Sequence, residues 1–391
     1  MIVVTESVRI SLDSVMRHFE ELEDPRSEVN LQHPLVSVVV ISLMAVLAGA
    51  AGPTALARWA VLKGEELRKV LPLPNGIPQK DVYRRVLSTL QPGAFQVCFT
   101  SWLQSLRAAA ATATATGVER PIFAVDGKTL RRSHNRNKGL GALHSVTVWE
   151  SDFGLTLAQV ATAEKSNEIT AIPEVLKLVD LKGAIITIDA MGTQKAIAKQ
   201  IVESEADYVF GLKGNQSKLH EAVVDYVAQQ MENDFANVRV RRCVTHDKGH
   251  GRVETRTYLQ MPAPRSLPGF DQWAGLKSIG VVIHHCVRDG RTTDEVRYDI
   301  SSLAVSVKRF ARAVRSHWGI ENSCHCSLDV TYREDESRIS DEHLRETFAW
   351  LNRFTLSLLH QHPGPGSIAM KRRSCGWDFN FLTQVLAGKD T

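Results

Sequence analysis

The sequence predicts an α/β protein in which a mixed sheet flanked by helices is joined to an all-helical N-terminal domain and a β-rich insertion. Three observations indicate this fold class. Apolar residues recur at helical spacing through the first hundred residues. From Pro121 onward, short apolar runs typical of buried strands alternate with helical segments. A second group of strand-like segments, separated by turns that contain glycine, fills residues 237–302 before helical periodicity returns.

The N-terminal domain, residues 1–107, is expected to be a series of helices interrupted by proline and glycine. We expect these helices over residues 12–22, 35–51, 53–70, 80–90 and 92–107. The stretch 108–117 consists almost entirely of alanine and threonine and offers no large side chain to pack. It is therefore predicted to be a linker, after which residues 118–391 form the second domain.

An uncharged segment, Leu35 to Ala57, comes close to the length of about 20 apolar residues that a membrane span needs. Ser37, Gly49 and Pro53 interrupt it, so we expect a buried helix and no membrane partner. Six cysteines in 391 residues show no disulfide framework, which is typical of a cytoplasmic protein. The formal net charge of +4 permits nucleic-acid binding without requiring it.

The second domain is predicted to begin with elements in the order βββαβαβα. The strands are expected over 123–125, 142–149, 155–162, 184–188 and 208–212, and the helices over 169–179, 194–204 and 217–231. The insertion is expected to hold strands 239–245, 252–260, 279–287 and 295–301. Further helices are predicted over 307–327, 341–360 and 379–386.

Three acidic residues stand in settings that suit a metal-dependent phosphoryl-transfer site. Asp126 and Asp189 each end an apolar run, and Glu321 lies in a helical stretch. Two divalent ions about 4 Å apart can stabilise the attacking and leaving oxygens at phosphorus, and Mg²⁺ prefers carboxylate ligands. The strand order predicts that Asp126 and Asp189 are neighbours in the sheet. The alternative third acids are Asp329, eight residues after Glu321 and the second choice, and Glu334, Asp335 and Glu336. For Asp126 and Asp189 the alternative is a turn or helix-cap residue at a strand end.

Two runs of positive charge lie beside these acids. Residues 121–149 contain five lysines and arginines and only one acid, Asp126, and residues 305–320 contain four and no acid. Phosphate contacts of this kind position a duplex and give salt-dependent affinity. The candidate contacts are Lys128, Arg131, Arg132, Lys165, Asn167, Lys213, Asn215, Gln216, Arg312, Arg315 and His317. For each of them the alternative is an ordinary solvated or structural side chain.

Two other patterns are weak. Cys324-His325-Cys326 lacks a second ligand pair at the spacing of structural zinc sites, so packed helix residues are the better interpretation. Gly139 and Gly141 follow a basic run without the strand-to-helix context of a phosphate loop, so no nucleotide cofactor is expected.

Several segments in a fixed order resemble the ISAs1 insertion-sequence family of DDE transposases, relatives of the H-repeat-associated proteins within the IS4-like group. These segments are Gly76–Asp81, Phe123–Arg131, Glu164–Pro173, Thr187–Gly192, Asp207–Gln216, His317–Asn322 and Leu328–Val330. The resemblance implies a ribonuclease-H-like catalytic core with Asp126, Asp189 and Glu321 as the metal-binding triad. It also implies that residues 237–302 are the family's β insertion and residues 1–107 its associated N-terminal domain.

The sequence therefore predicts a transposase that cleaves DNA at element ends and transfers the freed strand into target DNA, using two Mg²⁺ ions, with Mn²⁺ as an alternative. Two other functions stay open: a transposase-derived DNA-binding protein that no longer catalyses, and a stand-alone nuclease with the same core. The expected partners are double-stranded DNA and, by analogy, a second copy of the chain. The expected location is the cytoplasm, in association with the nucleoid.

Overall fold

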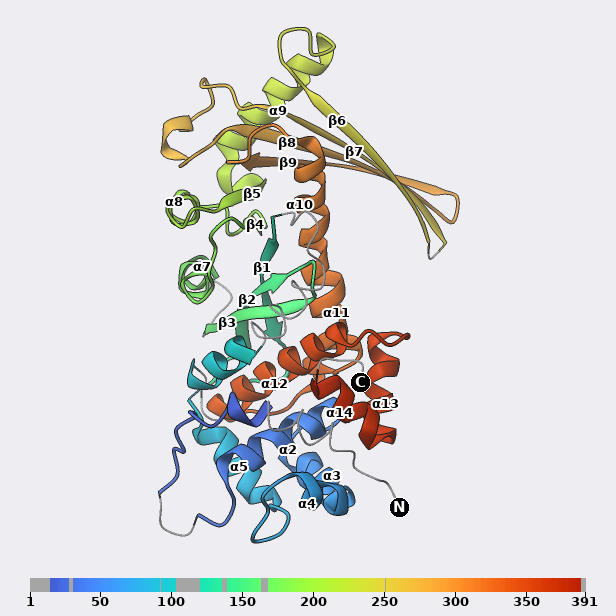
Figure 1. The fold of residues 1–391 in the computed structure, drawn as a ribbon. Coiled ribbons are helices and arrows are strands. Elements are labelled where there is room, and N and C mark those ends of the chain that lie inside the picture. The colour runs from blue at the N-terminus through green and yellow to red at the C-terminus, as the bar shows by residue number, and fades with distance from the viewer. Residues whose placement is uncertain are drawn as a thin grey trace.

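The computed structural model describes residues 15–27, 31–91, 93–102, 120–135, 139–162, 168–249 and 251–387. The predicted linker 108–117 and the beginning of the first predicted helix lie outside the described residues. The described chain is a mixed α/β protein with one large sheet, and a body of helices lies at one end of it (Figure 1). The predicted fold class is confirmed at this level.

Nine strands form a single sheet in the order β3-β2-β1-β4-β5-β9-β8-β7-β6. The inner strands are β1 (Ile122–Leu130), β2 (Leu143–Glu150), β3 (Leu155–Thr162), β4 (Ile185–Ile188) and β5 (Asp207–Leu212). β4 is parallel to both β1 and β5, while the other neighbours are antiparallel. The outer strands are β6 (Arg241–Gly249), β7 (Arg252–Pro262), β8 (Ser278–Arg288) and β9 (Arg291–Ser301).

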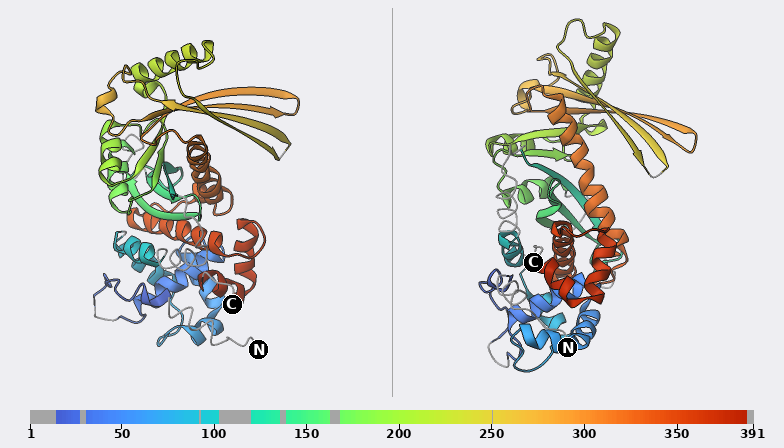
Figure 2. Two further views of the ribbon diagram at one scale, coloured as in Figure 1. Left: turned by 45° about the horizontal axis from the view of Figure 1, so that its top comes forward. Right: turned by 45° about the vertical axis from the view of Figure 1, so that its right-hand side comes forward.

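The predicted β insertion continues the sheet. β9 pairs with β5, with Phe210 opposite Ile300, so that β6 to β9 extend the edge that β5 would otherwise leave open. Figure 2 shows these strands projecting beyond the helices as long hairpins. The inner strands are buried on both faces, as their unbroken apolar runs predict, whereas β6 is exposed along almost its whole length. Charged side chains on such an edge discourage pairing with other chains.

Helices cover both faces of the sheet. α7 (Glu168–Lys177) and α8 (Lys195–Glu203) lie on one face, and α10 (Val307–Gly319) crosses the other from the outer strands to β1 (Figures 1 and 2). Gly280 on β8 lets α10 approach closely, because a Cβ atom there would lie less than 3.0 Å from the Phe310 ring. α9 (Ser217–Glu232) follows β5 through the short turn η3 (Gly214–Gln216), and η4 (Phe270–Gln272) lies between β7 and β8.

Helices from the two ends of the chain pack into one body. Its N-terminal members are α2 (Leu35–Leu47), α3 (Pro53–Leu62), α4 (Gly64–Val70) and α5 (Lys80–Thr89), and its C-terminal members are α12 (Glu342–Gln361), α13 (Ile368–Trp377) and α14 (Phe379–Ala387). α12 contacts α2 and α5 directly. The ring of Phe354 on α12 lies 3.8 Å from Phe99 and 4.6 Å from Trp102, between centroids. An aromatic core therefore joins the two groups.

α2 is the apolar segment that the sequence analysis assigned to the protein interior. Twelve of its thirteen residues are buried. Among the described residues, no helix combines the length and apolar character needed to cross a bilayer.

Three expectations about the extent of strands and helices were wrong, and one helix was missed. β1 does not end at Val125 but continues to Leu130, because its second half pairs with β2. The single helix expected over 53–70 is broken at Lys63, and α13 was not predicted at all, because its polar sequence lacks an apolar stripe. The helix expected over 307–327 changes to a π-helix, η5 (Ile320–His325), before ending in α11 (Cys326–Val330).

Candidate active site

Asp126 and Asp189 lie side by side at one level of the sheet. The parallel pairing of β1 and β4 ends with Val125 opposite Ile188, and each aspartate is the next residue of its chain. Asp189 Oδ1 accepts hydrogen bonds from the backbone N–H groups of Met191, at 3.1 Å, and Gly192, at 3.4 Å. The predicted neighbourhood of these two strands is confirmed. The turn chemistry at Asp189, offered as the alternative to a functional role, is also present.

Glu321 belongs to the helical segment that continues directly from α10. It lies in the π-helix η5 and is exposed, and it contributes to the electrostatic environment of Asp126. In the same turn of helix, His325 places its Nδ1 atom 3.4 Å from Asp126 Oδ2. A π-helical turn widens the helix by one residue and is frequently found at functional sites. It changes which side chains of residues 317–325 face the sheet.

The carboxyl group of Asp126 has an unusual environment. Burial, together with the negative charges of Asp189, Glu321 and Glu168, raises its pKa to about 7, against the opposing effect of a 2.8 Å hydrogen bond from the Gly127 N–H. Burial also lowers the pKa of His325, to about 3, so the imidazole is neutral and does not compensate these charges. Among the described residues, no lysine or arginine forms an ion pair with Asp126, Asp189 or Glu321, so these acids form a setting that a divalent cation could complete.

Glu168 and His144 belong to this region although the sequence analysis did not single them out. Glu168 is the first residue of α7, where an acid usually interacts favourably with the helix dipole at the surface. Here it is buried, with Oε1 2.7 Å from His144 Nε2 on β2. The signal available in the sequence was its place within the segment Glu164–Pro173. Its burial results from tertiary packing alone.

Asp329, the alternative third acid, is neutralised by a lysine. Its Oδ1 lies 2.5 Å from the Nζ atom of Lys128, which also lies 3.6 Å from Asp335 Oδ1. Lys128 is 7% exposed, so this ion pair holds β1 against α11. Of the two candidates, Glu321 is the one whose charge acts on Asp126.

The other predicted DNA contacts divide into two groups. Arg131, Arg132, Lys213 and Arg315 are exposed, although Arg131 also lies 3.2 Å from Asp335 and Arg315 4.0 Å from Asp247. The remaining described candidates are engaged within the protein. Arg312 binds Asp152 at 2.7 Å and the Arg120 carbonyl at 3.0 Å. Lys165 and Asn167 lie outside the described residues.

Two of the engaged candidates support the turn after Asp189. The Asn215 side chain donates to the carbonyl of Ala190, and Gln216 Nε2 donates to the carbonyl of Thr193 at 3.0 Å. The turn between β5 and α9 therefore fixes the loop that carries Asp189. In this conformation, the side-chain amides of Asn215 and Gln216 bind the backbone of this loop.

His317 is buried between α10 and β4. Its Nδ1 atom lies 3.0 Å from Thr187 Oγ1, and burial lowers its pKa to about 4. His317 therefore contacts β4 from α10, whereas His325, in η5, contacts Asp126.

A groove of about 1270 Å³ lies between the outer strands and α10. Its walls include Arg252, Arg256, Arg288, Arg291 and Arg315, together with the acids Glu254, Asp289 and Glu295. The α10 side of the groove carries Trp318, and the groove ends at Asn322, the residue after Glu321. We call this the arginine groove. Its excess of positive charge and its position beside η5 connect the outer strands with the carboxylate cluster.

Three potential metal ligands lie in the arginine groove. Donor atoms of Glu254, His284 and Cys286 are all within 4.8 Å of one another, and the described residues contain no other such group of three. However, Glu254 is ion-paired with Arg256 and, at 3.1 Å, with Arg252. Because two arginines already compensate the negative charge of Glu254, this group is a weak metal site. The carboxylate of Asp126 has no such arginine partner among the described residues.

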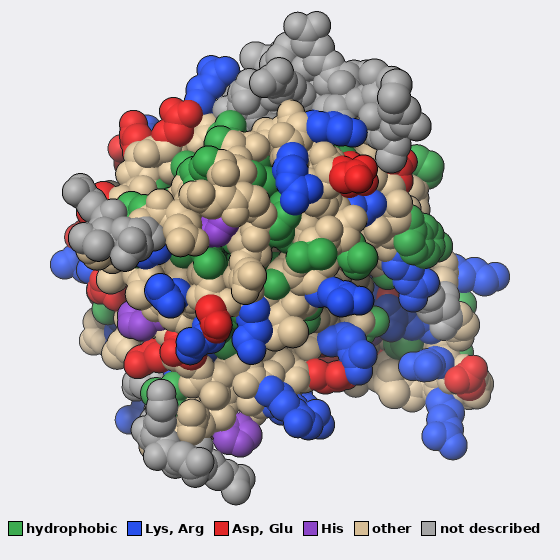
Figure 3. Space-filling view, turned by 90° about the horizontal axis from the view of Figure 1, so that it is seen from below, with side chains coloured by type: hydrophobic (Ala, Val, Ile, Leu, Met, Phe, Trp, Pro, Cys, Tyr) green, Lys and Arg blue, Asp and Glu red, His purple; other side chains and the backbone are tan. Residues whose placement is uncertain are grey.

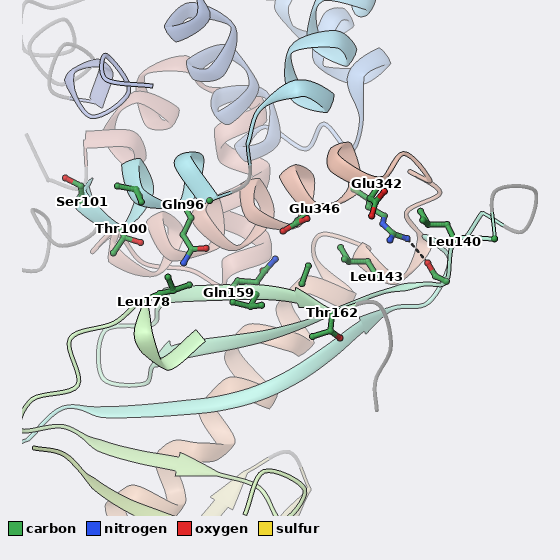
Figure 4. Close-up of a pocket in the computed structure, with 17 residues that line it drawn as sticks. Gln96, Thr100, Ser101, Leu140, Leu143, Gln159, Thr162, Leu178, Glu342 and Glu346 are labelled. Carbon is green, nitrogen blue, oxygen red and sulfur yellow. Dashed lines mark hydrogen bonds between the residues drawn. The ribbon is translucent and has the colours of Figure 1, made fainter. Parts of the chain in front are cut away.

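A second cavity, of about 880 Å³, separates the helical body from the sheet. Gln96, Thr100, Gln159 and Glu346 line it, and Arg345 bridges its rim to the Gly141 carbonyl (Figure 4). None of the clustered carboxylates lines this cavity. The face of the helical body seen from below carries positive, acidic and apolar side chains in alternation, without one continuous basic patch (Figure 3).

Comparison with known families agrees with the class of protein that this site suggests. Residues 118–359 match the family described as "Transposase DDE domain", and residues 16–103 match "DDE_Tnp_1-associated". The chain belongs to the DDE transposase family. Transposases of this family generally use divalent metal ions.

Individual relatives extend over nearly the whole chain. The "H repeat-associated putative transposase YhhI" of Escherichia coli K12 is 32% identical over 385 residues, covering 97% of this chain and 99% of the relative. The "Putative transposase YncI" of E. coli O157:H7 is 35% identical and covers 97% of this chain and 95% of the relative. A solved piggyBac transposase synaptic complex with hairpin DNA covers 98% of this chain and 79% of that chain at 10% identity. Its TM-score of 0.38 is too low to establish a shared fold.

Proposed function

We propose that this protein is an active insertion-sequence transposase of the ISAs1 group with a ribonuclease-H-like catalytic core. It would cleave DNA at the ends of its element and join the freed 3′ hydroxyl to target DNA. The proposal is supported by the position of Asp126 and Asp189 directly after the paired ends of two adjacent parallel strands, and by the electrostatic effect on Asp126 of Glu321, 132 residues beyond Asp189. The division into a domain of residues 1–107, a linker and a catalytic domain of residues 118–391 stays a prediction.

Asp126, Asp189 and Glu321 would hold the divalent cations, which we propose to be two Mg²⁺ ions, with Mn²⁺ as an alternative. When bound, such ions stabilise the attacking and leaving oxygens of an in-line displacement at phosphorus. The residues of the chain fit this role, because the Asp126 carboxylate is surrounded by further negative charge. His325, neutral at physiological pH, would orient Asp126 without adding a competing positive charge.

The arginine groove supports double-stranded DNA as the partner. Arginines in a groove that leads to Glu321 can contact phosphates and so place a strand against the carboxylates. Arg131, Arg132 and Lys213, which follow β1 and β5, would make further phosphate contacts. Because both ends of an element must be processed, we propose that two copies of the chain act together on DNA.

The proposal is tested with full-length protein and a DNA fragment that carries the inverted repeats flanking the gene. Wild type should nick and join this fragment in Mg²⁺, and Asp126→Asn should bind the fragment with unchanged affinity but neither cut nor join it. Cutting without joining would identify a stand-alone nuclease. Binding without any cutting by wild type would identify a transposase-derived DNA-binding protein, and full activity of Asp126→Asn would refute the assignment of the carboxylates.

A further inference from the structure

A buried pair of residues, Glu168 and His144, lies against the backbone beside Asp126. The His144 side chain is 1% exposed and that of Glu168 is 9% exposed, and Nε2 of the ring lies 2.7 Å from Glu168 Oε1. On its other side, the ring Nδ1 lies 2.7 Å from Thr129 Oγ1. The Thr129 hydroxyl contacts the Nδ1 side of the ring, while Nε2 lies against the carboxylate as a close contact without hydrogen-bond geometry. The ring is therefore packed between Thr129 of β1 and Glu168.

Gly127 makes room for this pair. A Cβ atom at Gly127 would lie 2.7 Å from both Glu168 Cδ and His144 Nε2, a separation below 3.0 Å that real Cβ atoms essentially never show. The carboxylate consequently rests on the backbone of the residue that follows Asp126. Any side chain at position 127 would displace it from the carboxylate cluster.

Within the described residues, no lysine or arginine forms an ion pair with Glu168, whose close contact is the His144 ring. Burying an ionised carboxylate costs free energy unless it is paired, and placing it near three further carboxylates adds repulsion. Glu168 contributes to the raised pKa of Asp126 in this way. An apolar residue at the start of α7 would fill the same space without that cost. The arrangement is favourable once a cation is bound, because a cation attracts every member of the cluster.

We propose that Glu168 is a fourth carboxylate of the cation site, and that His144 is a positioning residue that holds it there. This inference rests on the proposed function, since it adds a residue to the site formed by Asp126, Asp189 and Glu321. The carboxylate would bind the divalent ion directly or through one of its waters. Thr129 and Gly127 complete the arrangement, the first by fixing the ring and the second by leaving space.

The test measures Mn²⁺ binding to full-length protein by isothermal titration calorimetry, without DNA. Glu168→Gln preserves the shape of the side chain but removes its charge, and we expect its Mn²⁺ affinity to fall at least about tenfold, a loss of about 1.4 kcal/mol. Glu174→Gln is the matched control, because Glu174 is on the same helix, 58% exposed and paired only with Lys177. Its affinity should equal that of wild type.

Two further variants separate a role in cation binding from a role in packing. His144→Gln keeps a polar group beside the Glu168 carboxylate and should retain most of the Mn²⁺ affinity, whereas His144→Leu places an apolar group there and should lose it. In EDTA at pH 8, Glu168→Gln should unfold at the same temperature as wild type or higher, because a repulsive charge has been removed. On adding Mn²⁺, the melting temperature of wild type should rise by more than that of the variant.

Asp126→Asn distinguishes failure of this inference from failure of the proposed function. If Asp126→Asn loses Mn²⁺ binding while Glu168→Gln binds as wild type does, the fourth carboxylate is refuted and the cation site stands. If Glu168→Gln instead unfolds at a lower temperature in EDTA, the residue serves packing and the inference is equally refuted. If Asp126→Asn binds Mn²⁺ like wild type, the proposed cation site itself is wrong.

Discussion

The carboxylate cluster on the inner strands and the arginine groove on the outer strands belong to one sheet but have opposite electrostatic character. Asp126 is largely buried among other acids, and its pKa is raised to about 7, whereas the groove is open and lined by five arginines. Charges in a buried site interact strongly because little water screens them, while exposed charges can exchange water for phosphate at small cost. The inner strands thus suit chemistry and the outer strands suit binding, and α10 contacts both.

The sharpest test of the inner region compares the two candidate third acids. Glu321→Gln should reduce DNA cleavage by about 10³-fold, since loss of a metal ligand removes about 4 kcal/mol of transition-state stabilisation. Asp329→Asn should reduce it far less, because Asp329 is already paired with Lys128. Single-turnover cleavage in Mg²⁺ measures both. The reverse ranking would move the third acid from η5 to α11.

A buried ion pair connects α12 with the inner strand β2. Arg353 on α12 and Glu334 are both completely buried and lie 3.1 Å apart, and Arg353 also bonds to Ser145 and Thr147 on β2. Arg353→Met leaves the buried glutamate with the Asn352 amide but without its cationic partner, and should lower the free energy of unfolding by about 3–5 kcal/mol. Urea denaturation measures this loss.

The control for that measurement is Lys177→Met, which breaks an ion pair whose members are 62% and 58% exposed. It should change the free energy of unfolding by less than about 1 kcal/mol. Equal decreases in the free energy of unfolding of the two variants would mean that the buried ion pair stabilises the protein no more than the exposed one.

The pH dependence of stability tests the repulsion within the cluster. In the absence of metal, folded Asp126 keeps its proton up to about pH 7, while the unfolded chain releases it near 3.8. The folded state therefore binds more protons in this window, and its stability falls as pH rises from about 4 to about 7, then stays constant. Asp126→Asn should remove that component.

We compare the free energy of unfolding of Asp126→Asn with that of wild type in EDTA by thermal unfolding. At about 1.4 kcal/mol per pKa unit, the difference in favour of the variant should be larger at pH 8 than at pH 4 by on the order of a few kcal/mol. The gain should disappear when Mn²⁺ is added to wild type. A stability difference that does not depend on pH would exclude repulsion as its cause.

The smallest effect is expected in the arginine groove. Arg291→Ala and Arg315→Ala should each weaken DNA binding by several-fold and reduce the slope of log affinity against log salt by about 1, if each arginine contacts one phosphate. Cleavage at saturating DNA should be unchanged. Lys199→Ala on α8, on the other face of the sheet, is the control and should leave the slope as it is. Unchanged binding in both arginine variants would place the DNA elsewhere.

Much of the inner region follows from local patterns. The apolar runs around residues 122–125 and 185–188 predict buried strands, and the alternation of strands with helices predicts that β1 and β4 are adjacent. The parallel pairing of β1 with β4 confirms that these strands, which Asp126 and Asp189 follow, are neighbours. The outer strands were also predicted individually. Their attachment to β5 was not, because strand pairing across about 90 residues leaves no trace in local periodicity.

The same distinction explains the site residues that were missed. Glu168 and His144 have no local signature, since a glutamate at a helix start and a histidine on a strand are ordinarily surface residues. Only the packing of α7 against Gly127 buries them. Lys128 was predicted as a phosphate contact, but the approach of α11 supplies Asp329 as its partner. His317 was likewise predicted as a DNA contact, but β4 supplies Thr187 as its partner.

By itself, the sequence determined the mixed α/β class, the positions of most strands and helices, and the acidic residues that end two of the strands, because these depend on interactions between near neighbours in the chain. The tertiary structure decided that the insertion continues the sheet, that both ends of the chain build one helical body, and that a fourth carboxylate joins the cluster. These features depend on contacts between distant segments, whose free energy comes from burial and charge in the assembled fold.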